Sequence, residues 1–228
     1  LSDNLRHQPW VKEVNYISSA LIPIIKIVAE EKYNKMRIDI SIQDEKHFGL
    51  KCVEVVKKFI NRYESLKPLV LSLKNMLKLA NLNDPYKGGM SSYGLILMIV
   101  YFLQTQKKNG FDISKNENNI GQLFYSFSHF YGVDFDFNKY VIIVSTNNDD
   151  EPKDLQYNLN YLQSTQSGLI IVDPLNSENN VEKSCFQSIN LRMIFIVALK
   201  ALLEDCECGC HYNEDGEEYS NLKVEHCF

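Results

Sequence analysis

The chain has 228 residues and a mass of 26.4 kDa, long enough to bury a substantial core in one large domain or two small ones. The longest apolar run, 95–103, is too short to cross a bilayer, so no membrane partner is expected. The six cysteines, four of them beyond residue 205, do not form a disulfide framework and predict a reducing compartment.

The net charge of −5 is unevenly distributed. Residues 51–87 carry eight basic side chains against three acidic ones, whereas residues 204–225 carry eight acidic side chains and one lysine. The middle of the chain therefore attracts phosphate and the tail repels it. The alternative to phosphate binding is that most of these lysines simply lie on solvent-exposed faces of helices.

The first fifty residues predict a small β-containing piece. The sequence predicts a short helix over 9–20, an edge strand carrying Pro23 over 21–28, and a strand over 37–42. In the last strand Ile38, Ile40 and Ile42 face a core, and Asp39 faces the other side. A strand holds such a carboxylate rigidly near those of its neighbours, which suits a metal ion. A solvent-facing aspartate is the commoner alternative, although aspartate is disfavoured in strands.

Two amphipathic helices follow, over 49–63 and, beginning at Pro68, over 68–80. Lys74 and Lys78 are spaced four apart and lie on one face of the second helix. Two ammonium groups one turn apart can hold a polyphosphate as point charges. The alternative is again a solvated face.

A turn with paired glycines, 83–91, leads into a helix that Ser91 caps and that is apolar nearly all round to Gln104. From this turn we expect free backbone N–H groups to lie close to serine hydroxyls, including that of Ser92, and to the ring of Tyr93. Amides and hydroxyls suit the phosphates of a nucleoside triphosphate, and the ring suits its base. Local chemistry alone favours an ordinary Gly-Gly turn with a serine N-cap.

The second half predicts two helices and two strands, over 120–131, 188–203, 140–145 and 169–172. The last strand ends at Asp173, and a polar loop with Asn176 and Asn179 follows. Asparagine presents a donor and an acceptor together, which fits the edge of adenine, although an Asx-turn is the alternative.

The tail holds Cys206, Cys208, Cys210 and His211, which are soft ligands for zinc. One residue between successive cysteines is too tight for a standard zinc module. A disordered acidic end is the alternative.

In this order and spacing, the segments resemble the template-independent RNA nucleotidyltransferases of the DNA polymerase β superfamily, in particular the TRAMP-type poly(A) polymerases. The matching stretches cover most of 20–203, and they are 22–27, 38–41, 68–74, 82–104, 119–132 and 172–181. The resemblance implies an α+β fold. Residues 1–50 would be the C-terminal part of a polymerase β-like nucleotidyltransferase sheet, residues 51–203 a mostly helical central (PAP-associated) domain, and residues 204–228 an acidic tail.

The resemblance also implies roles for individual residues. Asp39 would be the third catalytic carboxylate and would help bind the two Mg²⁺ or Mn²⁺ ions of the intact enzyme. Tyr93 would stack on the incoming base. The other nucleotide-binding residues would be Gly49, Lys74, Lys78, Ser92, Asp173, Asn176 and Asn179. Relatives that prefer UTP have histidine where this chain has Asn179, so the resemblance implies ATP as the substrate.

The implied function is addition of AMP from ATP to RNA 3′ ends, in the nucleus or, as the alternative, in the cytoplasm, with a zinc-knuckle RNA-binding protein and an RNA helicase as partners. The chain opens with Leu1, and the family's Gly-Ser and Asp-x-Asp motifs are expected upstream of it. Residues 42–44 also depart from the family pattern, which affects contacts to the sugar. We therefore expect this chain alone to transfer no nucleotides. The alternatives are an inactive nucleotide- or RNA-binding scaffold and a terminal uridylyltransferase.

Overall fold

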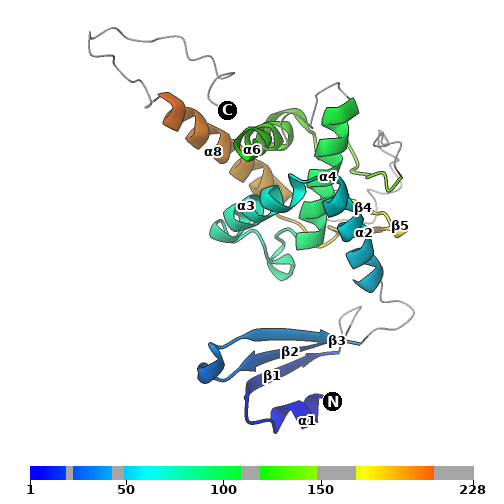
Figure 1. The fold of residues 1–228 in the computed structure, drawn as a ribbon, viewed down its shortest axis with the longest axis vertical. Helices are drawn as coiled ribbons and strands as arrows, with labels where there is room; N and C mark the ends of the chain where they lie inside the picture. The colour runs from blue at the N-terminus through cyan, green and yellow to red at the C-terminus, as the bar shows by residue number, and fades with distance from the viewer. Residues whose placement is uncertain (19–22, 43–48, 109–118, 148–167, 208–228) are drawn as a thin grey trace. The chain divides into compact units, whose positions relative to one another are not determined.

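The computed structural model describes residues 1–18, 23–42, 49–108, 119–147 and 168–207, with the side chains of 204–207 left out (Figure 1). The chain divides into two compact units, Leu1–Glu54 and Val55–Phe228. None of the described helices has the length and apolar character that crossing a membrane requires. The predicted tail ligands from Cys208 onward lie outside the described residues, as do Gln43 and Asp44.

The N-terminal unit contains a three-stranded antiparallel sheet in the order β1 (Val11–Ile17), β2 (Ile24–Ala29) and β3 (Arg37–Ser41), preceded by a short helix α1 (Ser2–Arg6). Its small core consists of the buried side chains of Val11, Ile25 and Ile27. The strand predicted over 37–42 is confirmed as β3. Ile38 and Ile40 pack against the core, whereas Ile42 lies beyond the strand end and is 71% exposed.

The helix predicted over 9–20 is wrong, because this segment contains strand β1. Its apolar residues Val11, Val14 and Ile17 recur every three positions, a spacing that resembles one face of a helix. In the structure a register shift between Val11 and Glu13 takes up the extra residue, so a strand accommodates the same spacing.

The second unit is mostly helical, and the boundary between the units falls within α2. Its main elements are α2 (Gly49–Arg62), α3 (Leu66–Leu79), α4 (Ser92–Lys108), α6 (Ile120–His129), a π-helical turn η3 (Phe130–Asp134), β4 (Val172–Asp173), β5 (Asn176–Asn180) and α8 (Ser188–Glu207). The predicted helices over 49–63, 68–80 and 188–203 are confirmed.

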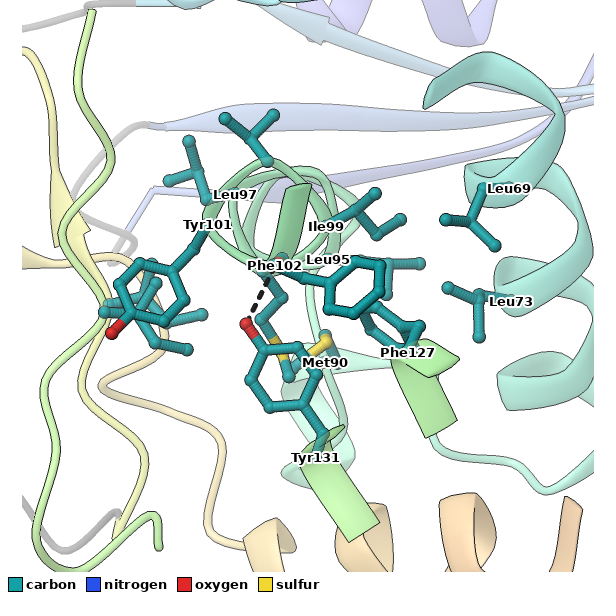
Figure 2. Close-up of a cluster of buried hydrophobic side chains, with 14 of the residues drawn as sticks. Leu69, Leu73, Met90, Leu95, Leu97, Ile99, Tyr101, Phe102, Phe127 and Tyr131 are labelled. Carbon is teal, nitrogen blue, oxygen red and sulfur yellow. Dashed lines mark hydrogen bonds between the residues drawn. The ribbon is translucent and has the colours of Figure 1, made fainter. Parts of the chain in front are cut away.

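Helix α4 lies at the centre of the core of this unit, as its apolar sequence predicts (Figure 2). Every residue from Leu97 to Gln104 is buried. Aromatic rings from α4, α6 and α8 meet beside it, including Phe102, Phe127 and Phe195. The buried hydroxyl of Tyr131 donates to the Met98 carbonyl at 2.8 Å, which ties η3 to α4.

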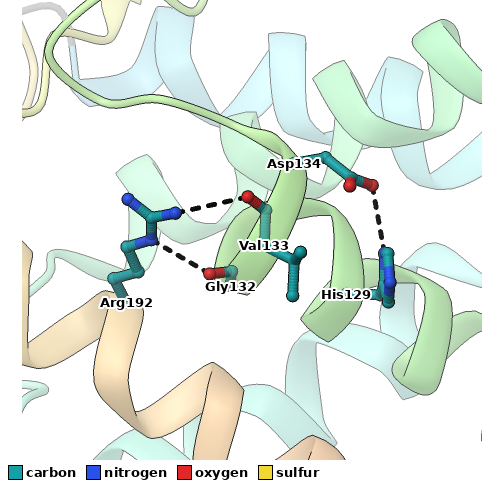
Figure 3. Close-up of polar contacts among 5 residues, drawn as sticks. All are labelled: His129, Gly132, Val133, Asp134 and Arg192. Carbon is teal, nitrogen blue, oxygen red and sulfur yellow. Dashed lines mark hydrogen bonds and ion pairs between the residues drawn. The ribbon is translucent and has the colours of Figure 1, made fainter.

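The helix predicted over 120–131 changes to a π-helical turn after His129. Arg192 of α8 donates from Nε to the Gly132 carbonyl at 2.9 Å and from Nη2 to the Val133 carbonyl at 3.2 Å (Figure 3). His129 and Asp134 contact each other at 3.0 Å across the same turn. Arg192 thus satisfies carbonyl groups that a regular helix end would leave free.

The strand predicted over 140–145 is also wrong, since the segment has only isolated bridges, at Tyr140 and at Ile142, which pairs with Ile171. Gln104 of α4 instead holds this segment: its side chain donates to the Ser145 carbonyl at 2.8 Å and accepts from the Ser145 amide at 3.0 Å. A long-range contact of this kind leaves no local signal in the sequence.

The polar loop predicted after Asp173 is a β-hairpin made of β4 and β5. The Asn180 side chain takes part in its hydrogen bonding, accepting from the Ile171 amide at 3.0 Å and donating to the Leu169 carbonyl at 3.2 Å. Because an asparagine side chain satisfies backbone groups here, a stretch with low strand propensity still forms a hairpin.

Candidate nucleotide-binding site

The turn before α4 closes on itself. The amides of Lys87 and Gly89 donate to the Asp84 carbonyl at 3.0 and 2.9 Å, and the amide of Gly88, with φ 77°, donates to Pro85 at 3.1 Å. The Met90 amide likewise donates to Leu82 at 2.7 Å. For residues 87–90 the prediction of free backbone N–H groups is therefore wrong, because folding of the turn uses these amides internally.

Ser91 caps α4 as predicted. Its hydroxyl accepts from the Gly94 amide at 2.9 Å and donates to Oε1 of Glu182 at 2.5 Å. The Ser91 hydroxyl is thereby occupied. The first turn of α4 then offers the exposed Ser92 and the half-buried Tyr93 to a ligand.

Three of the predicted nucleotide-binding residues lie together, where the start of α4 meets the β4–β5 hairpin. The Tyr93 hydroxyl lies 3.5 Å from Oδ1 of Asp173, and the Asn179 side chain donates to Oδ2 of Asp173 at 3.1 Å. Asp173 is 6% exposed and also accepts from the Leu175 amide at 2.9 Å. We call Tyr93, Asp173 and Asn179 the hairpin cluster.

The hairpin cluster has a clear chemical use. Asp173 orients the phenol ring of Tyr93 and the amide of Asn179 from one buried carboxylate. An amide that gives one N–H to Asp173 keeps a second N–H and a carbonyl oxygen for another partner. A flat ring beside an oriented amide can stack on a nucleobase and hydrogen-bond to its edge.

The other predicted nucleotide-binding residues lie outside this cluster. Asn176 is exposed and its Oδ1 accepts from the Glu178 amide at 3.1 Å, so it forms an Asx-turn at the hairpin. Lys74 and Lys78 are exposed one turn apart on α3. Gly49 is the first residue of α2.

Asp39 lies in the N-terminal unit, exposed on β3 and paired in register with Lys26 of β2. With Glu13 and Arg37 these residues line a cavity of about 590 Å³. The described residues contain no group of three histidine, cysteine or acidic side chains placed to hold a metal ion. Two carboxylates, Asp39 and Glu13, beside a lysine and an arginine do not complete a two-metal site, so further ligands would have to come from other residues.

Glu182 was not singled out by the sequence, yet it contacts the start of α4 directly. It is 1% exposed, and burial raises its pKa to about 7. A glutamate shortly after a polar strand carries no pattern that separates it from a surface residue. Only the fold shows that it is buried against Ser91.

Comparison with known proteins finds that this chain is similar to poly(A) RNA polymerases. Residues 119–179 match the family described as Cid1 family poly A polymerase. The poly(A) RNA polymerase cid14 of Schizosaccharomyces pombe is 31% identical over 86% of this chain and 28% of its own length. The inactive non-canonical poly(A) RNA polymerase protein Trf4-2 of Drosophila melanogaster is 29% identical over 83% of this chain and 46% of its own. The chain thus spans less than half the length of these relatives.

Solved structures confirm the predicted α+β fold class. The polymerase core of TRAMP, an RNA surveillance complex, superposes with a TM-score of 0.76 at 23% identity, over 90% of this chain and 62% of that one. The Cid1 poly(U) polymerase with Mg and 3′-dATP bound superposes with a TM-score of 0.65 at 23% identity, over 86% of this chain and 68% of that one. At this identity the likeness establishes the fold.

Proposed function

We propose that this chain, a relative of the TRAMP-type poly(A) polymerases of the Cid1 family, is the nucleotide-binding part of an RNA 3′-adenylyltransferase. The hairpin cluster is the observation that carries the proposal, because it holds a ring and an amide in the arrangement that a nucleobase needs. In the reaction, an RNA 3′ oxygen bonds to the α-phosphorus of ATP, the bond to pyrophosphate breaks, and pyrophosphate leaves.

Six of the predicted residues have a task in this proposal. The Tyr93 ring stacks on adenine, and Asn179 hydrogen-bonds to its amino group and ring nitrogen. Lys74 and Lys78, with the Ser92 hydroxyl, attract the triphosphate. Asp39 would be one of the carboxylates that hold divalent metal ions, and those ions would supply stabilisation of the charge on the transferring phosphate. The remaining metal ligands belong to the upstream motifs that the resemblance predicts.

Asn179 supports ATP as the substrate rather than UTP. The Cid1 poly(U) polymerase has been solved, in work on its UTP selectivity, as a histidine-to-asparagine mutant bound to MgATP. That observation concerns the other protein, but it agrees with the expectation that asparagine favours adenine. The similarity to the core of an RNA surveillance complex supports RNA as the acceptor, and from the family resemblance we propose a zinc-knuckle protein and a helicase as partners.

An inactive scaffold is the second candidate. The Drosophila relative Trf4-2 is described as inactive, and the described residues of this chain contain no complete metal site. A scaffold of this kind would keep the hairpin cluster and bind nucleotide without transferring it. Nucleotide binding therefore tests what both candidates share, and nucleotide transfer separates them.

Titration of this chain with ATP tests the binding proposal. We expect Tyr93→Ala to weaken ATP binding about 5- to 150-fold, because base stacking on an aromatic ring contributes about 1–3 kcal/mol. Tyr93→Phe is the matched control: it keeps the ring, loses the contact to Asp173 and should weaken binding by about threefold or less. Isothermal titration calorimetry measures both. Equal ATP affinity in Tyr93→Ala and the unmodified chain would place the nucleotide elsewhere.

A further inference from the structure

Glu182 holds the residue that precedes α4 through both its backbone and its side chain. Oε1 of Glu182 accepts from the Ser91 hydroxyl at 2.5 Å and from the Ser91 amide at 3.1 Å, and Oε2 lies 3.3 Å from the same amide. Ser91 lies directly before Ser92 and two positions before Tyr93. One buried carboxylate therefore fixes the start of the segment that the proposed function assigns to nucleotide binding.

The first turn of α4 is shaped to receive this carboxylate. A Cβ added at Gly94 would overlap Oε1 of Glu182, so only glycine leaves the space that the carboxylate occupies. The Gly94 amide donates to Ser91, which in turn donates to Glu182. A negative charge at this end also interacts favourably with the helix dipole.

The backbone of Glu182 is equally fixed to the hairpin. Its amide donates to Oδ1 of Asn180 at 3.0 Å, and the same oxygen accepts from the Ile171 amide next to β4. Two contacts therefore join the start of α4 to the hairpin and the residues just after it: the first bridge pairs Ser91 with Glu182, and the second pairs Tyr93 with Asp173. The first bridge sets the position of the helix start, and the second orients the ring.

We propose that Glu182 is a positioning residue for the nucleotide, and that its ionised carboxylate, by holding Ser91, keeps Ser92 and Tyr93 in the arrangement that binds ATP. The inference rests on the proposed function. It adds that the ATP affinity of the site depends on whether the buried Glu182 side chain is protonated. Both oxygens of the Glu182 carboxylate face hydrogen-bond donors of Ser91. When the carboxylate is protonated, one of its oxygens carries a hydrogen and can no longer accept, so one hydrogen bond from Ser91 is lost or changes its direction.

The surroundings of Glu182 allow it to titrate near neutral pH. Burial raises its pKa to about 7, while hydrogen bonds from Ser91 and Cys185 act in the opposite direction. Cys185 is the titratable group that faces it from the loop before α8, and burial and the nearby carboxylate raise the pKa of that thiol to about 12. Ser91 and Gly94 face it from α4 and do not titrate. Cys185 therefore stays neutral at pH 6–8, and Glu182 is the group in this pair that changes charge.

Protonation has opposite expected effects on stability and on binding. The carboxyl group binds its proton more tightly in the folded chain than in the unfolded chain, where its pKa is about 4.5. The resulting stabilisation is fully present below pH 4.5 and is lost as the pH rises through 7. The melting temperature should therefore be higher at pH 6 than at pH 8, whereas ATP affinity should be higher at pH 8.

Glu182→Gln tests the inference because glutamine keeps the size of the side chain and removes its titration. In calorimetric titrations we expect the unmodified chain to bind ATP about fivefold to tenfold more tightly at pH 8 than at pH 6. The reason is that protonation of Glu182 at pH 6 removes about one hydrogen bond to a charged group. Glu182→Gln should show only the smaller change that comes from ATP itself. Glu178→Gln, at an exposed position of the same hairpin, is the matched control and should behave like the unmodified chain.

Hydrogen exchange of residues 91–95 gives a second readout that needs no nucleotide. At pH 8, Glu182→Gln should speed exchange of these amides several-fold relative to Glu178→Gln, and both variants should melt cooperatively. Unchanged exchange, or an unchanged pH dependence of ATP affinity in Glu182→Gln, would overturn the positioning role. Absence of ATP binding in every variant would refute the proposed function, and exchange would still decide whether Glu182 fixes the helix start.

Discussion

Replacing Asp39 with alanine is expected to lower RNA tailing at least about a hundredfold in a protein that carries this chain together with the upstream carboxylates that the family resemblance predicts. Loss of a ligand removes charge stabilisation at the transferring phosphate, an effect of about 3 kcal/mol or more. The structure gives the physical setting: Asp39 is exposed on a strand, so its removal leaves no cavity in the core.

The measurement is extension of a labelled oligo(A) RNA with ATP and Mg²⁺, followed by gel electrophoresis. Ser41→Ala is the matched control, because Ser41 is also exposed on β3 and has no assigned role in catalysis. The control should extend RNA at the rate of the unmodified protein. Tailing by Asp39→Ala at more than about a tenth of that rate would contradict the metal-binding role of Asp39.

Replacing Phe127 with alanine is expected to lower the free energy of unfolding of the helical unit by about 3–5 kcal/mol, the usual cost of deleting a fully buried aromatic ring. Phe127 is fully buried in the core (Figure 2). Its ring lies 5.6 Å from that of Phe102, 4.9 Å from Tyr131 and 5.4 Å from Phe195. The substitution therefore leaves a cavity among rings contributed by several elements.

Urea denaturation followed by circular dichroism measures this loss. Leu79→Ala, at the end of α3 and 78% exposed, is the control and should change stability by about 0.5 kcal/mol or less. A loss below about 1 kcal/mol for Phe127→Ala would mean that the aromatic cluster does not form the core described here.

Local sequence patterns correctly predicted the helices and strands whose position in the fold follows from their own residues. Alternation at Ile38 and Ile40 predicted β3, and the continuous apolar run predicted that α4 lies at the centre of the core. The serine at position 91 predicted the helix cap. In each case the burial or capping follows from residues close together in the chain.

The features that sequence reasoning missed depend on contacts between distant residues. Strand β1 needed a register shift against β2, and the hairpin needed the Asn180 side chain to replace backbone partners. Glu182 is 91 positions away from Ser91 along the chain, and the sequence contains no signal that joins them. In the turn before α4 the sequence predicted the glycine turn correctly. It did not predict that the amides of this turn would donate hydrogen bonds to carbonyl groups of the same turn.

The most direct test of the account is a comparison of nucleotide use by the intact protein, with ATP and UTP offered separately to the same RNA. We expect ATP to be incorporated at least about tenfold faster than UTP, because Asn179 presents a donor and an acceptor to adenine. Asn179→His should move the preference toward UTP, with Ser177→His as the control at an exposed position of β5. Equal or faster use of UTP by the unmodified protein would contradict the assignment of an adenylyltransferase.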